Sequence, residues 1–450
     1  MNRFQDMLGL RDGLISNELF TEDTHQRELE RIFGHCWLFV GHESMIPNPH
    51  DYILSQMGVD SVIVKRTGDG RVRAFLNKCR HRGNEVCVFE AGNARSFVCS
   101  YHGWAYGEGG ELTAVPYEQE AYGAGFDRRQ WGLVEIRTAT LGGLIFANWD
   151  KDASSLENYL GDAKWWLETF LLQEDMGGLE VVPGAQKYLM PVNWKLLAEN
   201  FAGDDYHFIS THASVVQVLS RSSDNRINHV SNPEQRRMAG TEFAVACNYG
   251  RGAPHGFLEI KTGTETYEHD LQAARSLGSD AVEWVTERRR RLEERVKQYC
   301  SKPYAFHVGN IFPNFALNGI STAFYGKGLI LHHPTAFDET EVWMWCAVEK
   351  SAPQAVKERQ KFVLMQRQAA AGMVAPDDHE NFQRISRNLR APLSRQVKFH
   401  YAMALGREHE DPRPPEWRND SKWPGLLLPQ FSETEQRDFY RYWAELMGEA

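Results

Sequence analysis

Two short pairs of cysteine and histidine constrain the fold of this 450-residue chain more than any other feature. The first pair is Cys79 and His81, the second is Cys99 and His102, and seventeen residues lie between the pairs. Each pair can occupy one tight loop, so two loops can bring four ligands to one centre. The pattern therefore predicts a metal site.

Two kinds of site use two cysteines and two histidines. Zinc binds them tetrahedrally, whereas a Rieske [2Fe–2S] cluster has both cysteines on one iron and both histidines on the other. Zinc-finger spacings pair one cysteine with another and one histidine with another, but here each loop offers one cysteine and one histidine. This interleaving favours a Rieske cluster, as do Gly83, Gly103 and Trp104 beside the ligands, and zinc stays open as the alternative.

The pattern of strand-like and helical segments along the sequence predicts two kinds of domain. Residues 38–150 alternate short β-branched and aromatic runs with glycine-rich turns, and residues 59–76 predict a β-hairpin around TGDG. Residues 21–37 have the periodicity of an amphipathic helix. The later chain mixes helical segments with strand-like ones such as 328–337, which is typical of an α+β domain.

A second group of potential ligands lies in residues 193–214, NWKLLAENFAGDDYHFISTHAS. His207 and His212 are five residues apart, which places them roughly 140° apart on a regular helix. The helix must kink or widen if both are to bind one metal ion. Asp204 shares a face with His207 and could accept a hydrogen bond from the far nitrogen of a ligating ring.

One carboxylate would complete a set of two histidines and one acid. On Fe(II), such a set leaves positions open for O2 and substrate. The richest acidic segment is 376–382, PDDHENF, which follows a helix expected over 353–372. A one-electron carrier elsewhere in the same chain favours a redox metal at this second site.

The amino-acid composition limits the kinds of molecule that the chain is expected to bind. The chain has 50 basic and 60 acidic residues, a net charge of −10, which argues against broad binding to nucleic acid or anionic membranes. We expect no membrane span, and seven cysteines are too few for a disulfide scaffold, so we expect a reducing, cytoplasmic setting. A GxGxxG motif in a βαβ setting is absent from the sequence, so we expect NAD to bind another protein.

With both motifs in place, the chain resembles the large (α) subunits of Rieske non-haem iron aromatic ring-hydroxylating dioxygenases, of the naphthalene, biphenyl and phenylpropionate group. The similarity extends to ELERIFGHCWLFVGHES near the N-terminus and to NIFPNFAL at 310–317. It implies that Cys79 and Cys99 hold one iron of the cluster, while His81 and His102 hold the other.

The resemblance also implies roles around the mononuclear iron. The ligands would be His207, His212 and Asp378, with Asp378 preferred to Asp377 because the family's ligand is the second acid of a similar segment. Asp204 matches an aspartate that links a cluster histidine of one subunit to a catalytic histidine of its neighbour. The remaining implied site residues are Asn200 beside the iron and, as pocket lining, Phe201, Phe208 and His307. Two departures are Asp205, where relatives often have a small or apolar residue, and Phe382, which replaces a frequent tryptophan.

The fold implied by the resemblance is α+β. An N-terminal helix in residues 1–37 packs with the catalytic domain, and residues 38–155 form a Rieske domain of three small antiparallel sheets. That domain is inserted into a helix-grip (START/Bet v 1-like) catalytic domain with a large antiparallel sheet, residues 156–450. The implied assembly is a trimer of α subunits, usually with small β subunits in an α3β3 hexamer.

The implied activity is that of a terminal oxygenase. Electrons from NAD(P)H would arrive through a reductase and a ferredoxin, and both atoms of O2 would enter an aromatic ring to give a cis-dihydrodiol. A Rieske monooxygenase, such as a salicylate hydroxylase or a demethylase, is the alternative within the family. A plain electron carrier would need only about 110 residues, and a zinc-stabilised binding protein would be colourless. The sequence leaves the identity of the arene open.

Overall fold

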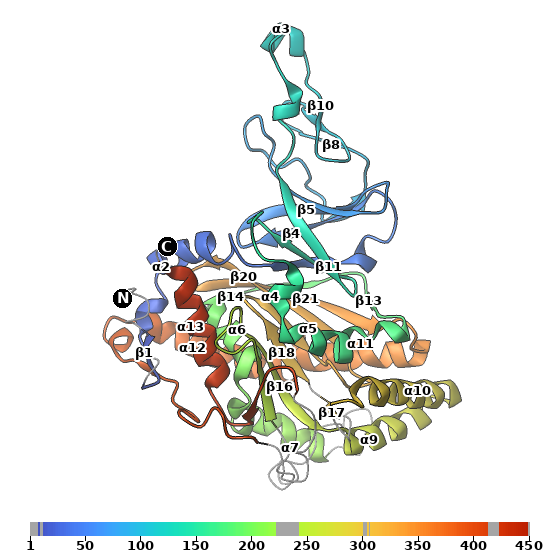
Figure 1. The fold of residues 1–450 in the computed structure, drawn as a ribbon, viewed down its shortest axis with the longest axis vertical. Helices are drawn as coiled ribbons and strands as arrows, with labels where there is room; N and C mark the ends of the chain where they lie inside the picture. Colours follow the sequence, from blue (N-terminus) through green and yellow to red (C-terminus); the bar gives the residue numbers. More distant parts are fainter. Residues whose placement is uncertain are drawn as a thin grey trace. The chain divides into compact units, whose positions relative to one another are not determined.

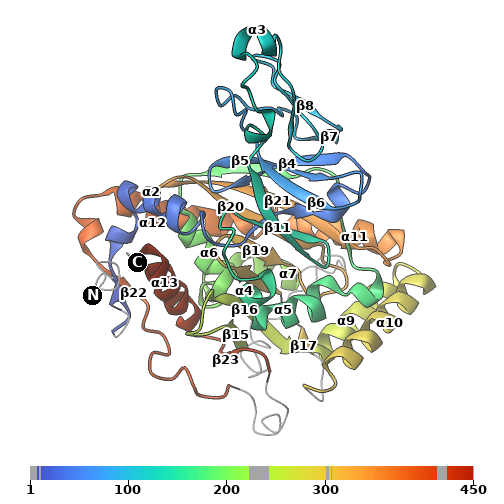
Figure 2. The ribbon, with the colours of Figure 1, turned by 45° about the horizontal axis from the view of Figure 1, so that its top comes forward.

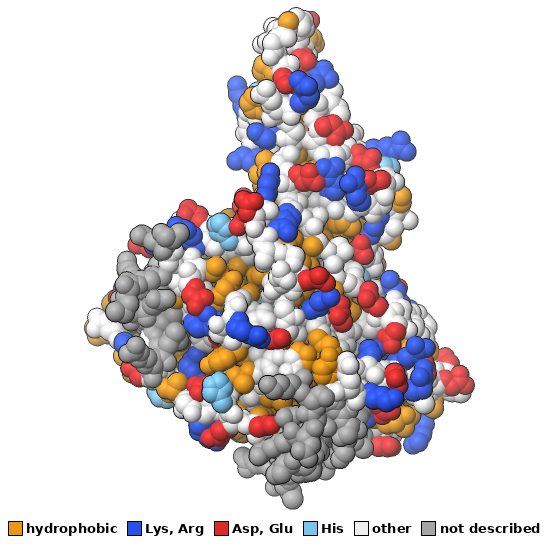
Figure 3. Space-filling model, viewed as in Figure 1, with side chains coloured by type: hydrophobic (Ala, Val, Ile, Leu, Met, Phe, Trp, Pro, Cys, Tyr) orange, Lys and Arg blue, Asp and Glu red, His pale blue; other side chains and the backbone are white. Residues whose placement is uncertain are grey.

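The computed structural model describes residues 8–9, 12–221, 243–299, 304–305, 307–412 and 423–448. Contacts between residues divide the chain into two units. The smaller unit is Phe33–Leu156, and the larger unit combines Met1–Ile32 with Glu157–Ala450. Figure 1 labels their helices and strands, and Figure 2 shows them turned by 45°. On the face drawn in Figure 3, basic and acidic side chains are interspersed.

The smaller unit is built from antiparallel strands. Seven of them form one sheet in the order β3-β12-β11-β6-β5-β4-β7, and three form a second sheet in the order β10-β9-β8. The bounds are β3 Leu38–His42, β4 Asp51–Met57, β5 Asp60–Arg66, β6 Val72–Leu76, β7 Ala91–Asn93, β8 Phe97–Val98, β9 Ala105–Tyr106, β10 Leu112–Ala114, β11 Glu135–Leu141 and β12 Leu144–Asn148, with the short helix α3 at Glu118–Tyr122.

Two predictions for this unit can be compared with its strands. The hairpin predicted for residues 59–76 is confirmed, since β5 and β6 pair antiparallel across the TGDG turn. The resemblance implied three small sheets, but β11 pairs with β12 along one stretch and with β6 along another. Two of the three sheets are therefore joined through this one long strand.

A buried cluster of hydrophobic side chains packs between the two sheets of the smaller unit. Ile63 and Phe75 contribute from the larger sheet, and Trp104 and Tyr106 from the smaller sheet and its loop. Cys79 and Cys99 belong to the same cluster and are 3% and 2% exposed. The two sulfurs that would bind iron are thereby shielded from solvent.

The larger unit contains an antiparallel sheet with strand order β13-β21-β20-β19-β18-β16-β15-β23, to which β14 and β17 add by pairing with β21 and β16. The bounds are β13 Leu179–Val181, β14 Gln186–Met190, β15 Phe243–Cys247, β16 His255–Thr262, β17 Tyr304–Ala305, β18 Val308–Ile311, β19 Phe315–Asn318, β20 Lys327–Ala336, β21 Glu339–Glu349 and β23 Leu426–Pro429. Three short strands form a separate sheet, namely β1 Leu8–Gly9, β2 Leu14–Ile15 and β22 Phe399–His400.

Helices accompany this sheet, as the α+β prediction requires. Their bounds are α2 Glu22–Arg31, α4 Leu156–Leu160, α5 Asp162–Trp166, α6 Trp194–Gly203, α7 Ala213–Arg221, α9 Gly263–Arg275, α10 Ser279–Val296, α11 Gln354–Gln368, α12 Ala375–Arg390 and α13 Thr434–Met447, with a π-helix at Leu167–Leu172. The helix predicted for residues 353–372 is confirmed as α11. The helix predicted for 21–37 is shorter, because the chain turns after Arg31 and enters β3 at Leu38.

Helix α6 packs against β16, β18, β19 and β20. The approach is close at Gly256 of β16, where a Cβ atom would lie 2.0 Å from the carbonyl oxygen of Ala202. Only glycine allows the helix backbone to come this near the sheet. The contact fixes the height of α6 above the sheet, and with it the start of the segment that carries His207 and His212.

A buried ion pair joins three helices of the larger unit. Lys195 at the start of α6 lies 2.5 Å from Glu28 of α2, and both side chains are fully buried. Glu28 also accepts hydrogen bonds from the indole N–H groups of Trp194 and Trp443, at 2.8 and 2.7 Å. Because every one of these polar groups has a partner, the pair links α2, α6 and α13 without an uncompensated charge.

Removing one member of this pair should be costly. We expect Lys195→Met to lower the free energy of unfolding by about 3–5 kcal/mol, because it leaves the Glu28 carboxylate buried without its cation. Urea unfolding followed by tryptophan fluorescence measures the change. The exposed pair Arg384–Glu380 is the control, and Arg384→Met should change stability by less than about 0.5 kcal/mol. Equal effects of the two substitutions would contradict this account.

Candidate metal centres

Two loops of the smaller unit carry the four predicted cluster ligands, and both loops fold in the same way. In each loop the cysteine N–H bonds to the carbonyl five residues later, and the N–H four residues later returns to the cysteine carbonyl. The four bonds are Cys79 N–H to Asn84 O at 2.7 Å, and Gly83 N–H to Cys79 O, Cys99 N–H to Trp104 O and Gly103 N–H to Cys99 O, each at 2.9 Å. Gly83 and Gly103 have φ values of 80° and 72°, which glycine adopts without strain.

Hydrogen-bond donors surround the two sulfur atoms. The hydroxyl of Tyr106 lies 3.2 Å from Sγ of Cys79, and the side-chain amide of Asn84 lies 3.7 Å from Sγ of Cys99. Burial raises the pKa of the Cys99 thiol, but hydrogen bonds from the backbone of Tyr101 and His102, together with Asn84, lower it by more. The net lowering of this pKa favours the thiolate, which is the form that binds metal.

The two histidines of these loops lie beside each other. Their ring centroids are 4.4 Å apart with the planes at 71°, and His81 stacks on Trp104 at 5.0 Å. Nδ1 of His81 is buried and has no hydrogen-bond partner in the described part of the chain. Burial and the neighbouring His102 lower the pKa of His81, which keeps its ring neutral and available as a ligand.

The four cluster ligands can be compared with the spacing that a single metal ion requires. Ligands of one tetrahedral zinc lie about 3.3–3.8 Å apart, given its bond lengths of about 2.0–2.3 Å. Among the described residues, one group of three or more His, Cys, Asp or Glu side chains has its donor atoms all within 4.8 Å, and that group is His207, His212 and Asp378. The four cysteine and histidine side chains do not form such a group among the described residues, and two cysteines with two histidines are the ligand set of a Rieske cluster.

The second centre depends on a break in the helix after Gly203. A Cβ atom at Gly203 would lie 2.8 Å from Cβ of Glu435 and 2.6 Å from Oε1 of Gln436, so this position needs glycine against α13. Asp204 follows with non-helical backbone angles, φ −101° and ψ 88°, and accepts a hydrogen bond from the backbone N–H of His207 at 3.2 Å. A 3₁₀ turn at Tyr206–Ile209 and then α7 continue the chain. The sequence predicted a kink or a widened turn here, and the structure has a complete interruption between two helices.

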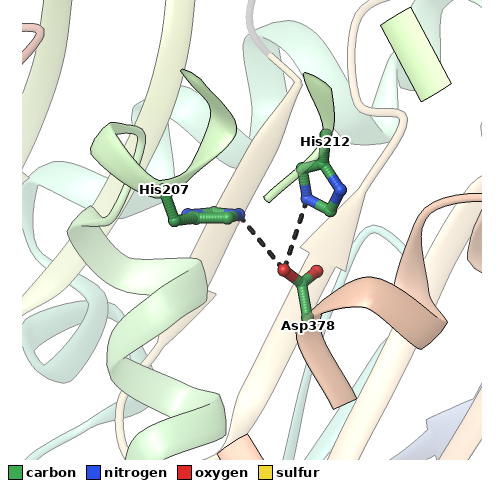
Figure 4. A group of neighbouring side chains, drawn as sticks. All are labelled: His207, His212 and Asp378. Carbon is green, nitrogen blue, oxygen red and sulfur yellow. Dashed lines mark ion pairs between the residues drawn. The ribbon is translucent and has the colours of Figure 1, made fainter. Parts of the chain in front are cut away.

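The interruption brings both histidines to one carboxylate. Nε2 of His207 lies 3.5 Å from Oδ1 of Asp378, and Nε2 of His212 lies 3.3 Å from the same oxygen (Figure 4). The ring centroids of the two histidines are 5.1 Å apart. Ligands bound to one ion at about 2.0–2.2 Å have such separations, so the three side chains fit a metal centre with two nitrogens and one oxygen.

Helix α12 supplies the carboxylate from its first turn. Asp377 and Asp378 both lie in this turn, behind Pro376. Asp378 meets the Nε2 atoms of both histidines, whereas Oδ2 of Asp377 lies 3.5 Å from the outer nitrogen of His212, Nδ1. This arrangement supports Asp378 as ligand and places Asp377 where it can orient His212.

Acidic and amide groups hold the His207 ring. Its Nδ1 lies 3.4 Å from Oδ2 of Asp204 and 3.4 Å from the amide nitrogen of Asn200. Burial lowers the pKa of His207, but Asp204, Asp378 and Asp205 raise it by more, to about 9. The surroundings therefore stabilise positive charge at this position, as a metal-cation site requires. With Nδ1–H directed to Asp204, Nε2 keeps its lone pair for a metal.

The predicted neighbours of the iron occupy different places. Phe208 lies against His212 with ring centroids 5.4 Å apart, and Phe201 lies 5.7 Å from His332. His307 contacts the ring of Tyr325 at 4.7 Å, and its role in a pocket stays a prediction. Asp205 is 4% exposed and accepts a hydrogen bond from Gln430 at 2.5 Å. Phe382 packs in a cluster with Met190 and Leu197.

The sequence interpretation missed Tyr188 and His332. Tyr188 of β14 lies with its hydroxyl 3.4 Å from Nε2 of His379, the residue after Asp378. His332 lies in the apolar run of β20, and a histidine in such a run was the available signal. Tyr188 carried no comparable signal in the sequence.

Comparison with known proteins gives the family. Residues 36–135 match the Rieske [2Fe–2S] domain, and residues 156–449 match the catalytic domain of ring-hydroxylating α subunits. The chain therefore belongs to the Rieske ring-hydroxylating oxygenases, as an α subunit. It is an oxidoreductase whose cofactors are a Rieske [2Fe–2S] cluster and a mononuclear iron, as predicted, and the zinc alternative is wrong.

Among its relatives is the α subunit of biphenyl 2,3-dioxygenase from Rhodococcus jostii (strain RHA1), 35% identical over 98% of this chain and 90% of that protein. The large oxygenase component of the naphthalene 1,2-dioxygenase system from Pseudomonas aeruginosa is also 35% identical, over 98% of this chain and 93% of that protein. A solved structure of naphthalene 1,2-dioxygenase from Rhodococcus sp. bound to indole superimposes with a TM-score of 0.80 at 32% identity, covering 99% and 97% of the two chains.

A more distant structure shows how widely the fold is used. A quaternary ammonium Rieske monooxygenase matches with a TM-score of 0.68 at 16% identity, a likeness that shows the fold alone. Within the described residues, the search for a helix long and apolar enough to cross a membrane finds none.

The hydrogen bond from Tyr106 to Cys79 should tune the cluster. Tyr106→Phe removes a donor that stabilises the more negative, reduced cluster, so the reduction potential should fall by about 20–60 mV. Potentiometric titration monitored by electron paramagnetic resonance measures it. Tyr101→Phe, on a side chain that is 60% exposed, is the control and should leave the potential unchanged. A rise in potential for Tyr106→Phe would refute this role.

Substitution of the two neighbouring aspartates of α12 should affect binding of the mononuclear iron differently. Asp378→Asn should abolish binding of the mononuclear iron while the cluster keeps its visible spectrum, because a carboxylate shared by both histidines is lost. Asp377→Asn should retain the iron, since it changes only a neighbour of His212. Iron content per chain after desalting measures both. Loss of iron in Asp377→Asn alone would reverse the assignment.

Proposed function

We propose that this chain is the catalytic subunit of a multicomponent dioxygenase that converts an aromatic ring to a cis-dihydrodiol. One observation carries the proposal: the same chain holds two repeated cysteine–histidine loops and, separately, two histidines whose Nε2 atoms face one carboxylate oxygen. An electron carrier alone would need only the loops. The relatives named for biphenyl and naphthalene support an arene as substrate.

The ligand assignments follow from the fit described above. Cys79 and Cys99 would hold one cluster iron, and His81 and His102 the other, with the unpartnered Nδ1 of His81 available for this. His207, His212 and Asp378 would hold the mononuclear iron. When bound, the cluster supplies single electrons and the ferrous ion activates O2 for addition to the ring.

The protein's own side chains position these ligands. Oδ2 of Asp204 lies 3.4 Å from Nδ1 of His207, which favours the tautomer with a proton on Nδ1 and a free Nε2. Asn200 contacts the same nitrogen from α6. His212 is 3% exposed, so this side of the centre is shielded from bulk water. Asp204 itself has a side-chain exposure of 36%, which leaves it able to reach a histidine of a neighbouring subunit.

Partners are part of the proposal. The relatives carry names such as "subunit alpha" and "large oxygenase component" of a "system", which supports additional components here as well. We propose a ferredoxin, a reductase that takes electrons from NAD(P)H, and small β subunits in an α3β3 assembly of cytoplasmic location. Transfer from the cluster of one α subunit to the iron of its neighbour, past Asp204, fits this assembly.

Product analysis tests the function. The holoenzyme is incubated with NADH, a ferredoxin, a reductase, an arene panel and isotopically labelled O2, and products are identified by mass spectrometry. Incorporation of both labelled atoms into a cis-dihydrodiol is the expected result. A phenol or a dealkylated amine with one labelled atom would identify a monooxygenase, and no oxygenated product from any arene would overturn the proposal.

Asp204 should couple the two centres. Asp204→Ala should lower arene turnover by about 10–100-fold while chemical reduction of the cluster stays normal, because the carboxylate that faces Nδ1 of His207 and would link the histidines is lost. Single-turnover reaction of the fully reduced enzyme separates coupling from chemistry. Glu358→Gln on the exposed face of α11 is the control. Unchanged turnover in Asp204→Ala would contradict the coupling role.

A further inference from the structure

One face of the large sheet carries polar side chains beneath α6. The register pairs Gly256 with Asn310, Asn310 with Ala316, and Ala316 with Ile330. Paired residues on antiparallel strands point to the same face, so Asn310 shares the face of Ala316 and Ile330. Those two residues pack in one cluster with Leu197 and Phe201 of α6. Asn310 therefore points to the side of the sheet that α6 covers.

Two further polar side chains lie on this face. Asn318 is two residues from Ala316, and a Cβ atom at its strand neighbour Gly328 would lie 3.3 Å from Cβ of Asn318 and 3.4 Å from Leu364 of α11. His332 is two residues from Ile330, and its ring lies 5.7 Å from that of Phe201. The alternation of side chains along a strand places both residues on the same side as Asn310.

These three side chains are buried, and each has at least one polar atom without a hydrogen-bond partner in the part of the chain that the structure describes. Asn310, Asn318 and His332 are 1%, 2% and 2% exposed. Both polar atoms of the Asn310 amide, Oδ1 of Asn318 and Nδ1 of His332 have no hydrogen-bond partner among the described residues. A buried amide without a partner costs its desolvation free energy, and native proteins supply such groups with a partner from the protein, water or a ligand.

This polar face adjoins the iron centre. His332 pairs with Val342, and Val342 pairs with Tyr188 on the next strand. The hydroxyl of Tyr188 lies 3.4 Å from Nε2 of His379, which follows the ligand Asp378. From the other side, Phe201 follows Asn200, whose amide contacts His207. A ring held against Phe201 and His332 would lie next to both segments that supply the iron ligands.

We propose that Asn310 and Asn318 bind a neutral hydrogen-bonding substituent of the aromatic substrate, such as a phenolic hydroxyl or a carboxamide, while its ring packs against Phe201 and His332. The inference rests on the proposed ring hydroxylation and names the substrate class for that same site. The two amides are diagonal neighbours on adjacent strands, since Asn318 pairs with Val308, two residues before Asn310. Each amide can both donate and accept, which matches a substituent that does the same.

The charge of the surroundings favours a neutral substituent. Burial, with smaller effects from His333 and His379, lowers the pKa of His332 to about 3, so its imidazole carries no charge. The strand neighbours of Asn310, Asn318 and His332 on this face are Gly256, Val308, Ala316, Gly328 and Val342, none of which is basic. A carboxylate buried here would lack a cation among them, which is unfavourable. Arg367 of α11 lies with its guanidinium over the ring of Tyr325, at 5.4 Å from the centroid.

Calorimetry on the holoenzyme without O2 tests the inference independently of turnover. The probes are naphthalene, 2-naphthol, 2-naphthamide and 2-naphthoate. We expect 2-naphthol and 2-naphthamide to bind about tenfold more tightly than naphthalene for one neutral hydrogen bond gained, and 2-naphthoate no more tightly than naphthalene. Equal affinity for naphthalene and the neutral polar probes, or tightest binding of 2-naphthoate, would overturn the inference, the latter in favour of pairing with Arg367.

Variants assign the preference to the two amides. Asn310→Leu and Asn318→Leu should each reduce the preference for 2-naphthol over naphthalene by about tenfold and leave the thermal midpoint unchanged or higher, because each removes an unsatisfied polar group. Ile330→Val, which changes shape but not polarity on the same face, should change all affinities alike. A preference that survives both asparagine substitutions would overturn the assignment. If ring hydroxylation itself fails, binding still follows this pattern or contradicts it, so the two failures are distinguishable.

Discussion

The interruption of the helix after Gly203 is the constraint on which the catalytic centre depends. On a continuous helix, His207 and His212 would point roughly 140° apart and could not share an ion. Helix α6 ends at Gly203, in close contact with Glu435 and Gln436, and the Asp204 side chain accepts a hydrogen bond from the backbone N–H of His207 in the following 3₁₀ turn. The same aspartate faces Nδ1 of His207. One residue thus shapes the backbone and orients the ligand that the backbone presents.

The sheet and the buried ion pair give this interrupted segment its position. Gly256 lets α6 approach the sheet, and Glu28 with Lys195 fixes the start of the helix against α2 and α13. The opposing carboxylate comes from the first turn of α12, far along the chain. The smaller unit positions its cluster ligands in another way. Two loops with the same hydrogen bonds each present one cysteine and one histidine. Two similar local loops bring the cluster ligands together, whereas the ligands of the mononuclear iron are brought together by the tertiary fold.

This contrast explains what could be predicted from the sequence. The loops at 79–81 and 99–102 were recognisable because their ligands are close in the chain, and the hairpin at 59–76 was recognisable from its turn. The pairing of His207 and His212 with Asp378 needed the resemblance, because 165 residues and a large sheet separate His212 from Asp378. Three other features depend on strand register and packing, which the sequence pattern does not carry. They are the joining of two sheets through β11, the position of Asp377 beside His212, and the polar face that contains Asn310 and His332. The early end of α2 at Arg31 was missed for the same reason.

The central claim is that one chain combines a two-iron cluster with a separate iron held by two histidines and an acid. The most direct test of this claim is to quantify iron and acid-labile sulfide in the fully loaded chain and to record the electron paramagnetic resonance spectrum of the reduced protein. The account predicts one iron per chain beyond the two that accompany the two sulfides, and a rhombic signal from the reduced cluster. Iron equal to sulfide, or zinc in place of iron, would contradict it.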